Sequence, residues 1–230
     1  METILRNIRT DLRLSMDGAV AASMRQMGVT FRMNFGVNIQ RIREISLRYE
    51  PGETLAEALW KEDVRELKIL ATMLFPPHEM TKEIANRWVE EIENQEIREQ
   101  ACKNLFQEVP ISNNLAKEWS THSDERVRVT GYWLFARLCI TRDVKVSQVE
   151  AEALLRRAVE DLRGDSILLL QSALNALRFY GRASEPRAQW VLRELSTFNS
   201  SGNTREKEMY EQLYYEFSSI DLFEDSFGDA

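Results

Sequence analysis

Apolar residues recur every three or four positions through most of the chain, which is the spacing of one buried face of an α-helix. Ile84, Trp88 and Ile92 fall on one such face, and Leu155 and Val159 fall on another. No segment sustains the alternation of polar and apolar residues that is typical of a β-strand. We therefore expect an almost wholly α-helical protein.

Helix-start and helix-stop signals divide this pattern into five successive pairs of helices. Two predicted starts carry capping boxes, Thr54 with Glu57 and Ser147 with Glu150, in which a hydroxyl and a carboxylate satisfy free backbone amides. The first helices of the pairs are expected at residues 54–62, 81–93, 112–121, 147–162 and 185–197. The second helices are expected at residues 64–75, 95–107, 125–140, 165–181 and 204–218.

A β-branched residue followed by arginine recurs at the start of three of the second helices. The three copies are Val64-Arg65, Ile97-Arg98 and Val127-Arg128, separated by 33 and then 30 residues. This period and this dipeptide resemble the units of HEAT-type α-solenoids, whose two-helix repeats bury their apolar faces only against neighbouring repeats. The resemblance implies an all-α, HEAT-like solenoid (α-α superhelix) of about five helical pairs.

We expect a single domain overall, in which residues 51–220 carry the repeats. Residues 1–50 do not show the repeat, and we expect them to form two or three helices that cap the stack. Residues 221–230 form an acidic and aromatic tail, which we expect to be a frayed terminus rather than a ligand for the basic end of the chain.

The charge of the chain is unevenly distributed. The net charge of −7 is unfavourable for binding nucleic acid, whose phosphates require a positive surface. Residues 1–48, however, contain eight arginines and four acidic residues, so this segment carries +4 and the remainder carries −11. Any contact with nucleic acid is therefore expected at the N-terminal end.

The remaining reactive residues point to no metal and no cofactor. Cys102 and Cys139 are far apart on separate predicted helices, so we expect buried free thiols. His78 and His122 lack cysteine partners at the spacing of metal ligands, and the sequence has no glycine-rich phosphate loop or nucleophile elbow. Because no long apolar run and no secretory signal is evident, we expect a soluble protein of the cytoplasm.

Residues 19–49 are the most distinctive stretch of the sequence. A helix of small residues leads through two methionines to a loop with Phe31, Phe35 and a Gly36-Val37 pair, and then to an arginine-bearing helix. With the following LAEALWKEDVRELKILATMLF, this stretch resembles the HEAT-like DNA alkylation repair family, bacterial glycosylases that remove positively charged N3- and N7-alkylpurines. The resemblance covers most of residues 15–195.

The resemblance implies a particular chemistry. In the family, an aspartate near the start of a concave helix stabilises the sugar cation as the glycosidic bond breaks, and tryptophans surround the cationic base. Aligned by hand, the aspartate position falls on Ala101 and the matching tryptophan on Ile97, while a later arginine falls near Val129 and a later tryptophan near Ala176. These joint departures argue for loss of the glycosylase reaction.

An alignment displaced by one helical turn leaves two candidate catalytic residues. Glu96 or Glu99 would then present a carboxylate to the groove, with Trp119 or Trp133 as an aromatic wall. The alternative is that the glutamates are solvated surface charges and that the tryptophans belong to the core. No catalytic residue is therefore assigned.

Seven arginines are candidates for contact with DNA. Arg65, Arg98 and Arg128 recur at one place in successive repeats, and a ladder of this kind suits either a phosphate backbone or ion pairs with neighbouring repeats. For the ion pairs, the sequence offers Asp63, Glu96 and Asp124 as partners. The better phosphate candidates lie in the net-positive segment, and they are Arg25, Arg32, Arg41 and Arg43.

Two functions follow from these observations. The first is a DNA-binding protein that contacts double-stranded, damaged or structured DNA through its backbone, with residual glycosylase activity if Glu96 or Glu99 replaces the missing aspartate. The second is a non-catalytic scaffold whose concave face receives a protein partner, as the acidic majority of the chain would permit. No membrane partner is expected.

Overall fold

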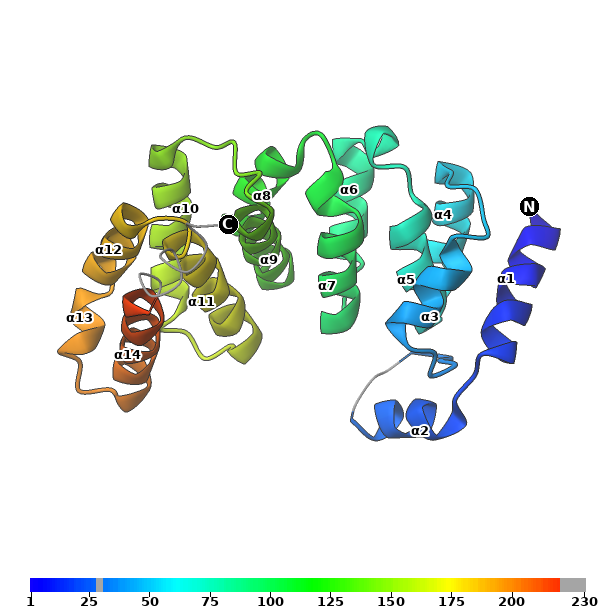
Figure 1. Cartoon of the computed structure of the whole chain (residues 1–230), viewed down its shortest axis with the longest axis horizontal. Helices are drawn as coiled ribbons and strands as arrows, with labels where there is room; N and C mark the ends of the chain where they lie inside the picture. The colour runs from blue at the N-terminus through cyan, green and yellow to red at the C-terminus, as the bar shows by residue number, and fades with distance from the viewer. Residues whose placement is uncertain (28–30, 220–230) are drawn as a thin grey trace, which may run out of the picture. The chain divides into compact units, whose positions relative to one another are not determined.

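The computed structural model describes residues 1–27 and 31–219. In this part of the chain every regular element is helical, apart from one isolated bridge between Met33 and Val64 (Figure 1). The prediction of an all-α protein is confirmed. The predicted acidic tail, residues 221–230, lies outside the described residues.

The chain divides into two compact units, Met1–Pro110 and Ile111–Ala230, called here the first and the second unit. The helices of the first unit are α1 (Glu2–Leu14), α2 (Gly18–Gln26), α3 (Ile39–Ser46), α4 (Glu53–Trp60), α5 (Arg65–Leu74), η1 (Pro77–Glu79), α6 (Lys82–Glu90), α7 (Gln95–Asn104) and η2 (Phe106–Glu108). Those of the second unit are α8 (Ser112–Ser120), α9 (Glu125–Thr141), α10 (Gln148–Asp161), α11 (Ile167–Gly181), α12 (Glu185–Glu194), α13 (Ser196–Asn199) and α14 (Thr204–Ser218).

Each unit has two layers of helices. In the first unit α5 packs against its partner α4 and also against α3 and α7, so α3, α5 and α7 form one layer. In the second unit α9, α11 and α14 form the corresponding layer, and α8, α10 and α12 pack beside it. All five predicted helical pairs are present near their expected boundaries. The helix expected at residues 185–197 is divided into α12 and α13, and the short η1 was not predicted.

One of the two predicted capping boxes is present. The Ser147 hydroxyl accepts a hydrogen bond from the Glu150 amide, and the Glu150 carboxylate accepts one from the Ser147 amide. The box of Thr54 and Glu57 was wrong, because α4 begins after Gly52 without a side-chain cap. The Glu57 carboxylate instead accepts hydrogen bonds from Arg87 and from the Trp88 indole, both at 2.8 Å.

Stacked tryptophans connect α4 to α6. The rings of Trp60 and Trp88 are nearly parallel, with centroids 4.1 Å apart, and Phe75 meets Trp88 edge-on. Both indoles are fully buried, and their N–H groups donate to Glu91 and Glu57. Because each buried donor has a partner, the stack contributes aromatic packing without an unpaired polar group.

A buried charge cluster joins α5 to α7. The Arg65 side chain is 2% exposed and donates from Nε and Nη2 to the Glu96 carboxylate, at 2.6 and 2.5 Å. Its Nη1 atom donates to Glu66 and to the carbonyl of Val37. Glu66, which is fully buried, also accepts from the amides of Phe35 and Val37. The cluster therefore fixes the loop before α3 as well as the next helical pair.

The other two repeated arginines are also buried. Arg128 donates to Asp161 at 2.8 Å and to the carbonyl of His122, and the Tyr132 hydroxyl donates to the same carboxylate at 2.7 Å. Arg98 donates to the Gln95 side chain and to the carbonyl of Ile92. Structural pairing is thus confirmed for Arg65 and Arg128, each with an acidic residue of the next pair.

Two of the three acidic partners proposed from the sequence were wrong. Asp124 caps the first turn of α9 and pairs with Arg126, and Asp63 accepts the backbone amide of Arg32. Glu96 does pair with a repeated arginine, but that arginine is Arg65 of the preceding repeat. Asp63 and Asp124 accept backbone amides instead. Arg65 and Arg128 reach Glu96 and Asp161 of the next pair.

Cys102 and Cys139 are buried, as predicted. Burial raises the pKa of the Cys139 thiol to about 12, because an apolar environment disfavours the thiolate. Cys139 is therefore not expected to be a nucleophile at neutral pH.

Glu66→Ala should destabilise the protein strongly. The substitution leaves two loop amides without an acceptor and removes one of the two carboxylates beside a buried guanidinium, so the free energy of unfolding should fall by about 3 kcal/mol. Urea unfolding followed by circular dichroism measures the change. Glu44→Ala, which breaks an exposed pair with Arg41, should change it by at most about 1 kcal/mol. Equal losses in the two variants would contradict this account.

Gly131→Ala should destabilise the second unit, where α9 crosses α8 closely. A Cβ atom at Gly131 would lie 2.2 Å from the backbone nitrogen of Ser120, so one of the two helices must move. We expect a loss of about 1–3 kcal/mol in thermal or urea unfolding. Gly202→Ala is the matched control, because nothing lies within 4 Å of its added Cβ. A Gly131→Ala protein as stable as that control would show that this crossing is loose.

Candidate nucleic-acid interface

The three repeated arginines are poorly placed for a phosphate backbone. Arg65, Arg98 and Arg128 are 1%, 2% and 8% exposed, and their N–H groups are directed at carboxylates, carbonyls and a side-chain amide. A guanidinium that is buried and already hydrogen-bonded offers few donors to a ligand in solvent. Their burial fits the structural alternative.

The four candidate arginines of the basic segment differ in their solvent exposure and in their hydrogen-bond partners. Arg25 is exposed in the last turn of α2, and Arg32 is exposed in the loop that follows. Arg43 is exposed on α3 and donates to Asn104 at the end of α7, at 3.3 Å. Arg41 is held by the Ser15 hydroxyl and by Glu44. The first three are therefore the better phosphate donors.

Two further arginines lie beside Arg32. Arg9 and Arg13, one turn apart on α1, line a hollow of about 310 Å³ with Arg32. Its other lining residues are the carboxylates Glu62 and Asp63 and the apolar Met33, Phe35, Val64 and Leu67. Arg9 is paired with Glu62 at 2.7 Å, whereas Arg13 is exposed. Sequence reasoning counted both in the basic segment without singling them out, and their spacing of four residues on one helical face was the available signal.

The loop that carries Arg32 is rigidly attached. Gly36 has a φ of 69°, a left-handed conformation that favours glycine, and a Cβ there would lie 2.2 Å from the carbonyl oxygen of Asp17. The flanking amides of Phe35 and Val37 donate to the buried Glu66. These contacts place the backbone of Arg32 next to the start of α5, where its amide donates to Asp63.

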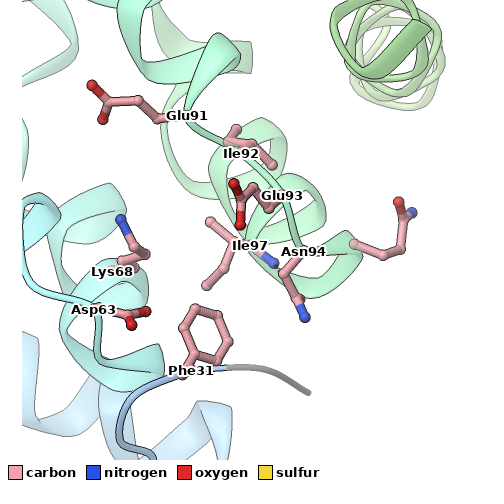
Figure 2. A pocket seen from close by; sticks show the side chains of 9 residues that line it. Phe31, Asp63, Lys68, Glu91, Ile92, Glu93, Asn94 and Ile97 are labelled. Atoms are coloured by element: carbon pink, nitrogen blue, oxygen red, sulfur yellow. Dashed lines mark hydrogen bonds between the residues drawn. The ribbon is translucent and has the colours of Figure 1, made fainter. Parts of the chain in front are cut away.

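A second pocket of the first unit, about 180 Å³ in volume, is acidic (Figure 2). Phe31, Asp63 and Lys68 line it from one side, and Glu91 and Glu93 come from the connection between α6 and α7. Three carboxylates face a single ammonium group here, so the pocket suits a cation or a hydrogen-bond donor rather than a phosphate.

Lys68 is committed to the fold. Its Nζ atom donates to the carbonyl of Trp60 at 2.7 Å and lies 4.7 Å from the centre of the Trp60 ring. Burial lowers the pKa of Lys68, and the nearby Glu91, Asp63 and Glu93 oppose that change. Its hydrogen bond and ring contact hold the ammonium at the wall of the pocket.

The candidate catalytic residues do not line this pocket. Both oxygens of Glu96 accept hydrogen bonds from Arg65, and the half-buried Glu99 accepts one from Gln95 at 3.0 Å. Ile97 and Ala101, onto which the family's tryptophan and aspartate were aligned, are 2% and 0% exposed. Ile97 contributes an apolar side chain to the acidic pocket, and Ala101 is enclosed in the core, so neither position offers a reactive group.

The predicted aromatic wall belongs to the second unit. Trp119 on α8 is buried, and Trp133 on α9 is half-buried. No cluster of three potential metal ligands occurs within residues 1–27 and 31–219. In the same residues, no helix combines the length and the apolar character needed to cross a membrane.

Comparison with known proteins decides the family. The sequence profile described as "DNA alkylation repair enzyme" matches residues 8–196, which is most of the chain. The chain belongs to this family. A search of curated proteins finds no match. The resemblance inferred from residues 19–49 and from the first repeat is therefore confirmed.

The chain is also similar to solved structures of repeat proteins. One is described as belonging to a new family of proteins related to the HEAT-like repeat DNA glycosylases, with affinity for branched DNA structures. It is 14% identical to this chain, with a TM-score of 0.78, and the match covers 91% of this chain and 93% of the other. A designed armadillo repeat protein is 13% identical, with a TM-score of 0.42, and covers 92% of this chain and 98% of its own. The match with the first of these structures confirms the predicted HEAT-like fold.

Proposed function

We propose that this member of the DNA alkylation repair family binds DNA through the sugar–phosphate backbone, and that branched or otherwise structured double-stranded DNA is its preferred ligand. The observation that carries the proposal is the exposed pair Arg13 and Arg32 beside a partly apolar hollow, in a segment whose net charge is +4. The family match and the reported affinity of the structural relative for branched DNA support it. A cytoplasmic location is part of the same proposal.

Backbone contact fits the kinds of side chain available. Arg13, Arg25, Arg32 and Arg43 are exposed and distributed over α1, α2, the following loop and α3. Phosphate contacts fix the orientation of a nucleic acid without reading its sequence. A protein of this kind would recognise the path of the backbone, which is what distinguishes a junction from a simple duplex.

We further propose that base excision is lost or strongly reduced. The carboxylate of Glu96 is neutralised by Arg65, and the two positions aligned with the family's reactive residues carry buried apolar side chains. Stabilisation of a developing sugar cation requires a carboxylate directed at the ligand. Glu99 is the one remaining candidate on α7, and its carboxylate accepts a hydrogen bond from Gln95.

Binding to a four-way DNA junction should be strongly salt-dependent. Because each neutralised phosphate contributes about 0.9 to the slope of log affinity against log salt, Arg13→Ala with Arg32→Ala should flatten that slope by about two. Fluorescence anisotropy with a labelled junction and the matching duplex measures both values. The control is Arg193→Ala with Lys207→Ala, which removes two exposed charges from the second unit.

The control pair should lower the affinity for the junction much less than the Arg13 and Arg32 pair. An unchanged slope in Arg13→Ala with Arg32→Ala would refute the assigned interface. Undetectable binding of the wild-type protein at low salt would refute DNA binding altogether. That result would favour the alternative function, a scaffold for a protein partner on the acidic remainder of the chain.

Purified protein should release no base from N7-methylated duplex DNA. The assay follows free methylated base by chromatography over several hours, with the intact duplex as the reference. Release that Glu99→Gln abolishes would contradict the proposed loss of activity and would identify Glu99 as the catalytic carboxylate.

A further inference from the structure

A basic hollow in the second unit is not explained by the interface described above. Its volume is about 620 Å³, within the range of small-molecule sites, and it lies where α9 and α11 end and α12 begins. Its lining contains three arginines and no carboxylate: Cys139, Ile140, Arg142, Val144, Phe179, Arg182, Ala183 and Arg187.

Arg142 adopts an unfavourable backbone conformation to reach this position. Its φ of 58° and ψ of 28° are left-handed, and within residues 1–27 and 31–219 no other residue except glycine has a positive φ. It ends α9 in the position where helices favour glycine, with its amide and that of Asp143 donating back to Cys139 and Leu138. A residue with a Cβ atom is strained in this conformation, whereas glycine is not.

The acidic residues nearby do not neutralise the hollow. Glu216 pairs with Arg178 at 2.8 Å and with Arg182 at 3.4 Å, so it is shared between two cations. Asp143 pairs with Lys145. Within the described residues neither Arg142 nor Arg187 forms an ion pair, and Arg187 lies 4.8 Å from the centre of the Tyr180 ring.

The helix ends give only part of the reason for these charges. The C-terminal ends of α9 and α11 carry partial negative charge, which favours a cation such as Arg142 or Arg182. That effect does not require a left-handed arginine, because a lysine or arginine in the last turn would provide it without strain. Backbone strain of this kind is typical of residues that are held in place for function.

The walls of the hollow also contain apolar surface. Phe179 is half-buried, with the Arg182 guanidinium 5.7 Å from the centre of its ring, and Ile140 is 43% exposed. An aromatic ring next to several guanidinium groups is the combination by which proteins hold a single nucleotide, with the base on the ring and the phosphate on the cations. The hollow therefore has both halves of such a site.

We propose that this hollow binds one unpaired nucleotide of a DNA strand. Arg142 and Arg187 would contact its phosphate, and its base would pack against Phe179. The inference rests on the proposed function in taking DNA as the ligand, and it adds a second contact that recognises a strand leaving the duplex. Such strands occur at branched DNA, so this site would supply preference for structure rather than for sequence.

Substitution of Arg142 by glycine separates binding from folding. Arg142→Gly should raise the melting temperature by about 2 °C, because it relieves the left-handed strain. It should also lower the affinity for a short labelled oligothymidine by about tenfold, because a charge-assisted contact is lost. Phe179→Ala should lower that affinity by about fivefold or more. Arg193→Ala, an exposed arginine of α12 outside the hollow, should change it by less than about twofold.

Several results would overturn the inference. Unchanged oligothymidine affinity in both Arg142→Gly and Arg187→Ala would exclude a phosphate site. A loss in Arg142→Gly with no loss in Phe179→Ala, together with equal displacement by inorganic pyrophosphate, would identify a site for a free anion and exclude a nucleotide. A lower melting temperature in Arg142→Gly would show that this arginine is retained for stability.

The two proposals fail in different ways. Junction binding that depends on Arg13 and Arg32 but not on the hollow would leave the proposed function standing and remove this site. Oligothymidine binding that depends on Arg142 and Phe179, with junction binding insensitive to Arg13 and Arg32, would support this site and remove the interface in the first unit.

Discussion

The first unit depends on the charge cluster of Arg65, Glu66 and Glu96. Arg65 and Glu66 are removed from water, and Glu96 stays partly exposed. The buried pair is stable only because its hydrogen-bonding groups are matched by one another, by Glu96 and by backbone atoms of the loop before α3. Apolar packing could hold α5 against α7 in many registers. The Arg65 guanidinium permits only one of these registers, because it must contact Glu96 on the next helical pair and Val37 in the preceding loop at the same time.

This arrangement explains why the arginines that recur in the sequence are not those that suit a ligand. A side chain that repeats in every helical pair occupies an equivalent place between pairs, and in this protein that place is interior. Arg13, Arg32 and Arg142 do not belong to the repeat. They lie on a helix face, in a loop and at a helix end, respectively, and each borders a hollow. In a repeat protein the binding surface is built from the irregular positions, since the regular ones maintain the stack.

The helices and the fold could be predicted from the sequence because their signals are local. These signals are the period of the apolar residues, the positions of proline and glycine, and the repeated dipeptide of a β-branched residue and arginine. It was insufficient wherever a side chain is recruited by a distant residue. Glu57 was predicted to belong to a capping box, but its carboxylate accepts hydrogen bonds from Arg87 and Trp88, some 30 residues away. The basic hollow joins the ends of α9 and α11, so no window of the sequence contains it. Its one local signal was an arginine where a helix end favours glycine.

The spacing of the ion pairs limits how such a chain can change its length during evolution. Arg65 meets an acid 31 residues later, and Arg128 meets one 33 residues later, which is one helical pair in each case. Duplication or loss of a complete pair preserves every such partnership. An insertion of half a pair would leave a guanidinium enclosed opposite an apolar face. Relatives should therefore differ by whole pairs of helices, and shorter insertions should be confined to the connections.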